Sequence, residues 1–278
     1  MKSTIFLIAL GILLAAIPLS TNNSTLKDGT IILTEDNHVF FSGRVDEASV
    51  AKASIELGQL SEKLSDNDTI YLVLDTPGGS VVSGNQFIDF GKSIPQKIKP
   101  ISIFAASMGY HMFQSFDERI MQVSSTIMSH RVSLSGLSGQ VPGELVTRLN
   151  SIISTSNQMD DVAAKRVGLT RIAYQQLIHD ELWLNGLDAV KTGHADRIAK
   201  LRCSNDLIKG TRVEAVDTIF GPVDVTFSTC PLITGYLSFK FNKMAQATGT
   251  SSYIVPRNEA EVVREIRNAK RKINLEAW

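Results

Sequence analysis

Along the first two thirds of the chain, stretches whose hydrophobic and polar positions are typical of strands alternate with stretches whose positions are typical of helices. Short apolar or β-branched runs, which are typical of strands, occupy residues 30–33, 39–42, 69–74, 100–106, 119–123, 126–129 and 195–198. Segments with a helical period lie between them, at residues 48–64, 81–93, 144–166, 170–178 and 185–193. Strands that alternate with helices predict an α/β domain over residues 28–200.

The pattern changes after residue 200. Residues 201–256 are β-rich and irregular, with strands expected at residues 223–227 and 236–241. Residues 257–278 predict a charged C-terminal helix with a single apolar stripe. We therefore expect a small β-rich extension that contains both cysteines, followed by a terminal helix, behind the α/β domain.

Residues 1–24 have the pattern of a signal peptide or N-terminal anchor. Lys2 precedes an uncharged, mostly apolar run at residues 5–19, and a polar run follows at residues 20–25. The apolar run is shorter than the ~20 residues that comfortably span a bilayer. No small-x-small cleavage triplet follows it, so membrane anchoring through residues 5–19 stays an alternative to cleavage. Either outcome predicts an exported protein, periplasmic or membrane-anchored and facing outside the cytoplasm.

The net charge and the cysteine content limit the partners and the kinds of site that we expect. The chain has 28 basic and 28 acidic residues, a balance that argues against nucleic acid as a partner. The two cysteines, Cys203 and Cys230, form a disulfide candidate in an oxidising compartment, with two buried free thiols as the alternative. Their spacing excludes a CxxC metal site, and we expect neither a metal nor a cofactor.

Ser107 is the candidate nucleophile. It follows an apolar run that ends in Ala105 and Ala106, and Gly109 comes two residues later. Small residues around a serine at the end of a strand permit the sharp strand-to-helix turn that exposes a nucleophilic hydroxyl. A serine at such a boundary is also typical of a helix N-cap, which is the structural alternative.

Backbone N–H groups and a base are the other requirements for acyl transfer. Gly79 follows a buried strand and opens a helix, so its N–H, with that of Met108, is a candidate oxyanion donor. Among the five histidines, His130 is the favoured base, because it ends a strand and precedes a glycine-rich loop. The other histidines carry no such signal, and two of them are expected at the surface: His38 and His194.

Four segments resemble a known family in order and spacing: TIYLVLDTPGGSVVSG from residue 69, AASMG from 105, IMSHR from 127 and WLNGLDAVKTGHAD from 183. They are similar to the proteolytic subunit of the Clp protease, and the resemblance covers residues 30–199. It implies the Clp/crotonase fold, a spiral of stacked β-α-β units. It also implies a Ser-His-Asp peptidase with Ser107 as nucleophile, His130 as general base, and Gly79 and Met108 as oxyanion donors.

The sequence departs from the family pattern at three places. Ile103 stands where the family usually has glycine, and Arg131 replaces glutamine after the histidine, with no proline behind it. The third member of the triad is ambiguous. An ungapped alignment places Glu181 at the family's aspartate, whereas a shift of one residue places Asp180 there. Asp180 is the favoured assignment and Glu181 the alternative.

The predicted function is that of a serine endopeptidase that acts on peptides or proteins as a homo-oligomer. The chain has no P-loop, so the activity is expected to be ATP-independent in itself. Two rival hypotheses are an inactive scaffold of the same fold that binds a partner and a crotonase-type enzyme acting on acyl-CoA. A third, the Ser-Lys dyad of signal peptide peptidase A, requires a lysine near Ser107. The nearest candidates, Lys92, Lys97 and Lys99, only flank a turn.

Overall fold

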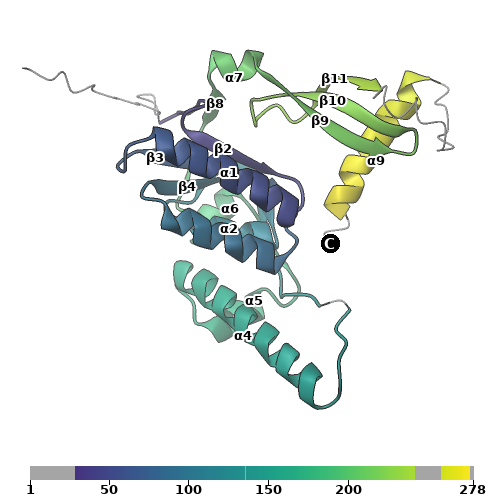
Figure 1. The fold of residues 1–278 in the computed structure, drawn as a ribbon. Helices are drawn as coiled ribbons and strands as arrows, with labels where there is room; N and C mark the ends of the chain where they lie inside the picture. The colour runs from purple at the N-terminus through teal and green to yellow at the C-terminus, as the bar shows by residue number, and fades with distance from the viewer. Residues whose placement is uncertain (1–28, 135, 242–257, 276–278) are drawn as a thin grey trace, which may run out of the picture.

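A six-stranded sheet forms the centre of the molecule. The computed structural model describes residues 29–134, 136–241 and 258–275 (Figure 1). Strands β2 to β5 run parallel in the order β2-β3-β4-β5, β6 pairs antiparallel with β5, and β7 adds a short parallel pair to β5. The strands are β2 (His38–Ser42), β3 (Thr69–Thr76), β4 (Lys97–Ala106), β5 (Ile120–Ser129), β6 (Leu182–Asn185) and β7 (Arg197–Ile198).

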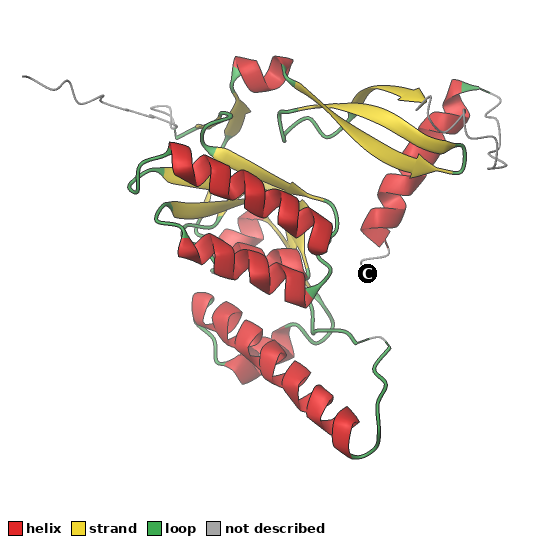
Figure 2. Cartoon of the chain, in the orientation of Figure 1, coloured by secondary structure: helices red, strands yellow, loops and turns green. Residues whose placement is uncertain are grey.

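Helices connect these strands, as the alternating pattern predicts. Helices α1 and α2 lie side by side over one face of the sheet, and α4 and α5 form a separate pair beyond them (Figure 2). Asp46 begins α1 with a capping box to Ser49, and Ser80 caps α2. The helices of this part are α1 (Glu47–Lys63), α2 (Val81–Ser93), α3 (Met108–Gln114), α4 (Gly143–Arg166), α5 (Arg171–Leu177) and α6 (Gly186–Lys191).

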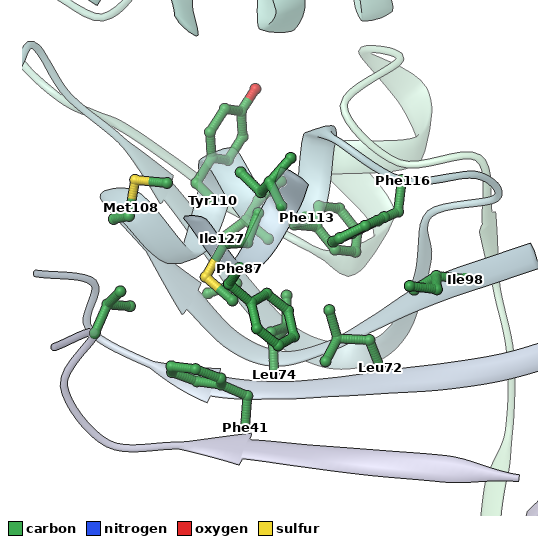
Figure 3. Close-up of a cluster of buried hydrophobic side chains, with 14 of the residues drawn as sticks. Phe41, Leu72, Leu74, Phe87, Ile98, Met108, Tyr110, Phe113, Phe116 and Ile127 are labelled. Carbon is green, nitrogen blue, oxygen red and sulfur yellow. The ribbon is translucent and has the colours of Figure 1, made fainter. Parts of the chain in front are cut away.

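Strand β3 is buried on both faces, as its continuous apolar run predicts. Leu72 and Leu74 point into the core beneath the helices, where Phe41 and Phe87 pack edge to face with ring centroids 5.7 Å apart (Figure 3). Tyr71 and Val73, the alternate positions, belong to a second core on the opposite face. The sheet is therefore held from both sides, which keeps its carboxyl-terminal strand ends in fixed positions.

A parallel strand pair covers that second face. Strand β1 (Ile31–Leu33) pairs with β8 (Leu201–Cys203), and α7 (Asn205–Lys209) follows. Cys203 and Cys230 form a disulfide with their Cα atoms 5.9 Å apart, and both are buried in the second core. The predicted disulfide is confirmed, and it fastens the start of the extension to the α/β domain.

Loss of this disulfide should destabilise the protein measurably. The crosslink joins residues separated by 27 positions, and the chain-entropy estimate for a loop of this size is roughly 3–4 kcal/mol. We expect the Cys203→Ala/Cys230→Ala double variant to unfold at lower urea concentration than the oxidised protein, with its free energy of unfolding reduced by about that amount. Equal midpoints for the two proteins would show that the crosslink does not constrain the unfolded chain.

The extension forms its own small core. Strands β9 (Thr211–Thr218), β10 (Gly221–Ser228) and β11 (Tyr236–Phe241) make an antiparallel sheet, and α9 (Glu259–Leu275) packs against it (Figure 1). Val262 and Ile266 of α9 are buried in this core together with residues of the sheet. The α/β fold class, with its β-rich extension and terminal helix, is confirmed.

The structure differs from the pattern in its details. Residues 119–123 and 126–129 are parts of one strand, β5, whose register against β4 shifts between Ser102 and Phe104. The four-residue strand β6 and the whole of β9 were not predicted individually. The expected signal or anchor at residues 1–24 lies outside the described residues. None of the helices in the described ranges is both long and apolar enough to cross a membrane.

Candidate active site

The turn at Ser107 has the geometry of an exposed nucleophile. Ser107 joins β4 to α3 with φ 54° and ψ −119°, a backbone conformation that non-glycine residues rarely adopt. Although the residue occupies the N-cap position of α3, its side chain makes no cap hydrogen bond. Its Oγ lies 2.7 Å from Nε2 of His130 instead. The hydroxyl is thus used for contact with an imidazole and not for helix capping.

Glycines let the turn fit closely against the neighbouring strand end. A Cβ atom on Gly78 would come within 2.6 Å of the Ala106 carbonyl oxygen and of the Ser107 Cβ. Gly78 itself has φ 93°, in the region that favours glycine. Gly78 is therefore required by the close approach of the Ser107 turn.

His130 reaches Ser107 because of the strand register. Ala106 pairs with Met128 across β4 and β5, and the Ser107 N–H donates to the Met128 carbonyl oxygen at 2.9 Å. His130 directly follows the end of β5, so its ring lies beside the end of β4. Both side chains are half-buried.

Two backbone N–H groups are available near the serine. Gly79 has φ 144° and lines the same hollow as Ser107, and Met108 begins α3. We find no acceptor for either N–H among the described residues. The neighbouring carbonyl groups of Val45 and Gly78 are occupied by the N–H groups of Ser80 and Val45, at 2.8 Å each. This arrangement fits an oxyanion hole.

A side chain at Gly79 should damage the site. An added Cβ would overlap the Val45 carbonyl oxygen, so Gly79→Ala must displace the backbone that carries the donor. We expect kcat for peptide hydrolysis to fall by about 10²–10³, the effect of losing one oxyanion donor. Gly143→Ala is a matched control, because a Cβ there meets nothing within 4 Å. An unchanged kcat in folded Gly79→Ala protein would remove Gly79 from the site.

The structure does not bring the candidate third members to His130. Asp180 is exposed, and its carboxylate lies 2.7 Å from Nδ1 of His179. Glu181, with φ 66°, accepts a hydrogen bond from Nε1 of Trp183 at 3.0 Å. In the part of the chain that the structure describes, no carboxylate contacts His130.

A different carboxylate lies in the hollow beside Ser107 and His130. Asp160 of α4 lines this hollow together with Ser129 and Tyr174, whose hydroxyl oxygens are 2.7 Å apart. Burial raises the pKa of Tyr174 to about 12. Sequence reasoning missed Asp160, because no motif surrounds it. The sequence offered one indication: Asp160 directly follows Met159, which lies on the apolar stripe of a predicted helix.

Apart from His130, no imidazole among the described residues is hydrogen-bonded to Ser107 Oγ. His111 is buried at the hollow, and burial lowers its pKa to about 4. His194 was expected at the surface, but this was wrong, since it is only 3% exposed and packs near Tyr110. Burial also lowers the pKa of His194 to about 4 and lowers that of the half-buried His38. Burial therefore favours the neutral form of all three imidazoles.

The departures from the family pattern do not enter the hollow. Ile103 packs against the second core, and Nη2 of Arg131 donates to the Gln175 carbonyl oxygen at 3.0 Å. No lysine is among the residues that line the hollow in the described part of the chain. Of the three lysines considered for a dyad, Lys99 instead pairs with Glu118 at 3.0 Å.

A serine bonded to an imidazole at a strained strand-to-helix turn, with free N–H groups beside it, is the arrangement of serine hydrolases. Comparison with known proteins agrees with this class. Residues 21–202, more than half of the chain, match the Clp protease family. The chain belongs to the Clp protease family.

The individual relatives have low sequence identity to this chain, but the matched segment covers most of each relative's length. The ATP-dependent Clp protease proteolytic subunit 1 of Chlamydia muridarum is 30% identical over 179 residues, 63% of this chain and 91% of the relative. The ATP-dependent Clp protease proteolytic subunit of Borreliella afzelii is 28% identical over 171 residues, 60% of this chain and 84% of the relative. Subunit 2 of the same protease from Pseudomonas aeruginosa is 28% identical over 163 residues, covering 58% and 79%. These likenesses support a peptidase of the serine type.

Proposed function

We propose that this protein is a serine endopeptidase in which Ser107 is the nucleophile and His130 the general base. The observation that carries the proposal is the 2.7 Å contact between Ser107 Oγ and His130 Nε2. It occurs at a backbone turn that only a constrained environment maintains. A structural serine would have no need of both features.

The proposed reaction follows from this geometry. Nε2 of His130 takes the hydroxyl proton while Ser107 Oγ attacks the peptide carbonyl carbon. The N–H groups of Gly79 and Met108 stabilise the resulting oxyanion. His130 then gives the proton to the leaving amine, which leaves an acyl-enzyme at Ser107. A water molecule, deprotonated by the same imidazole, then attacks the acyl carbon. The ester bond to Ser107 Oγ breaks, His130 returns the proton to Oγ, and the second product leaves as the free acid.

A base at Nε2 leaves the ring proton on Nδ1, where a carboxylate is expected to accept it. The register of β5 and β6 supports Glu181 for this role. Ser129 pairs with Leu182 in an antiparallel ladder, so Glu181 is the residue opposite His130. Asp180, the assignment favoured by the sequence, lies one position further away. Glu181 must leave the Trp183 indole to reach His130, a change of side-chain conformation in an exposed residue.

The setting of the activity is also a proposal. Substrates are peptides or proteins, and the protein works as a homo-oligomer, as the word subunit in the names of its relatives suggests. Hydrolysis itself uses no ATP, because the proposed steps involve only Ser107, His130 and backbone groups. Export, with the protein periplasmic or membrane-anchored, is supported by the pattern of residues 1–24 and by the disulfide.

A fluorophosphonate probe tests the proposal, because it reacts only with an activated serine. We expect the assembled protein to be labelled at Ser107, as located by tandem mass spectrometry, and heat-unfolded protein to be unlabelled. Absence of labelling at Ser107 in folded, assembled protein would leave the inactive scaffold as the better hypothesis. Specific binding of coenzyme A, with no labelling, would favour the crotonase-type alternative.

A further inference from the structure

The hollow beside Ser107 has a defined chemical character. Its lining includes three apolar residues, Val81, Met159 and Ala163. It also includes the hydroxyl-bearing residues Ser129, Tyr110 and Tyr174. Its volume is about 70 Å³, which suits a slender, unbranched side chain better than an aromatic ring.

Asp160 is the single charged residue among the described residues that line this hollow. Its Oδ2 accepts a hydrogen bond from Nε2 of Gln175 at 2.8 Å. Its Oδ1 has no donor in the described ranges of the chain. Asp160 is half-buried, and an anion in that position is stabilised by a cation that completes its hydrogen bonds.

The cations nearest to Asp160 have other partners. Nη2 of Arg131 donates to the Gln175 carbonyl oxygen, and Nη1 of Arg171 pairs with Asp161 at 2.6 Å. Burial raises the pKa of Asp160 in spite of Gln175, Arg131 and Arg171, so the surroundings compensate the carboxylate only in part.

A second polar group at the hollow, the Tyr110 hydroxyl, also supports a binding site there. The hydroxyl of Tyr110 is buried beside the Tyr174 hydroxyl, but it makes no hydrogen bond of good geometry among the described residues. Figure 3 shows its oxygen directed away from the hydrophobic cluster. A buried polar group without a partner is rare, and an unfilled binding site is one explanation of it.

We propose that this hollow binds the side chain of a lysine or arginine that immediately precedes the cleaved bond, with Asp160 as its counter-ion. The proposal rests on the function proposed above. The methylene groups of the substrate side chain would pack against Met159 and Ala163 while its cationic end reaches Oδ1 of Asp160. The enzyme would then cleave after basic residues.

A set of fluorogenic peptides that differ only in the residue before the cleaved bond tests this. We expect the full-length protein to hydrolyse the lysine and arginine peptides with kcat/KM about 10–100-fold above that for glutamine, the effect of a charged hydrogen bond. Asp160→Asn should abolish this preference by lowering kcat/KM for the lysine and arginine peptides to about that of the glutamine peptide, with a far smaller effect on the methionine and leucine peptides and on fluorophosphonate labelling. Asp160→Glu should retain part of the preference. Glu62→Gln, which removes an exposed carboxylate of α1 outside the hollow, should change nothing.

The alternatives give different results. If Asp160→Asn slows all peptides equally and also slows labelling, Asp160 orients His130 and the specificity proposal is wrong. If the wild-type protein shows no preference for basic residues but is labelled at Ser107, the specificity proposal fails and the peptidase proposal stands. If the wild-type protein is neither labelled nor active, both fail.

Discussion

Replacing Ser107 by alanine should lower kcat for peptide hydrolysis by about 10⁵–10⁶, the effect of removing the nucleophile from a serine peptidase. The variant should still fold, because the Ser107 side chain makes no cap bond and its one described hydrogen bond is to His130. Substrate binding should persist, so KM should change far less than kcat. The measurement is steady-state hydrolysis by assembled protein, with urea unfolding as the check on folding.

Ser124→Ala provides the matched control for this experiment. Ser124 is an exposed serine of β5, the strand that leads to His130, and it lies outside the hollow. Its replacement should leave kcat unchanged. Full activity in folded Ser107→Ala protein would contradict the assignment of the nucleophile.

Replacing His130 by glutamine should have an effect of similar size, with kcat reduced by about 10⁴–10⁶, because the serine then has no base. Ser107 and His130 act as a unit, so the double variant should be no slower than the worse single variant. His179→Gln is the matched control, since His179 is exposed and bonded to Asp180. Equal losses in His130→Gln and His179→Gln would mean that neither effect reports on the base.

The same cycle identifies the orienting carboxylate. Glu181→Gln should cost about 10⁴ in the wild type but add little in the His130→Gln background, because its effect passes through the imidazole. Asp180→Asn, one position away, should cost little in either background. The reverse result would assign the role to Asp180 and would require a shift of the loop before β6.

Much of the site could be predicted from the sequence because its parts are local. The ends of β3, β4 and β5 bring together Gly79, Ser107 and His130, and each follows a run with a clear strand pattern. Parallel strands place their carboxyl ends at one edge of a sheet, so three separate motifs converge there. The disulfide could also be predicted, because an even number of cysteines in an extension suggests a crosslink.

Other features depended on contacts between distant segments. Asp160 enters the hollow from α4, thirty positions after His130, and helical periodicity says nothing about which neighbour a polar residue will meet. His194 follows a turn, yet the Gln114 side chain donates to its carbonyl oxygen at 2.8 Å within the core. The orientation of Glu181 depends on the Trp183 side chain. Contacts of this kind, between residues distant in the sequence, leave no periodic pattern in it.

The most direct test of the central claim is to trap the acyl-enzyme. Protein treated with a p-nitrophenyl ester and quenched in acid within milliseconds should release a burst of p-nitrophenolate, one equivalent for each active site. Tandem mass spectrometry should find the acyl group on Ser107, and Ser107→Ala protein should show neither burst nor adduct. Peptidase activity with no acyl group on Ser107 at any quench time, or an adduct on another residue, would contradict the account.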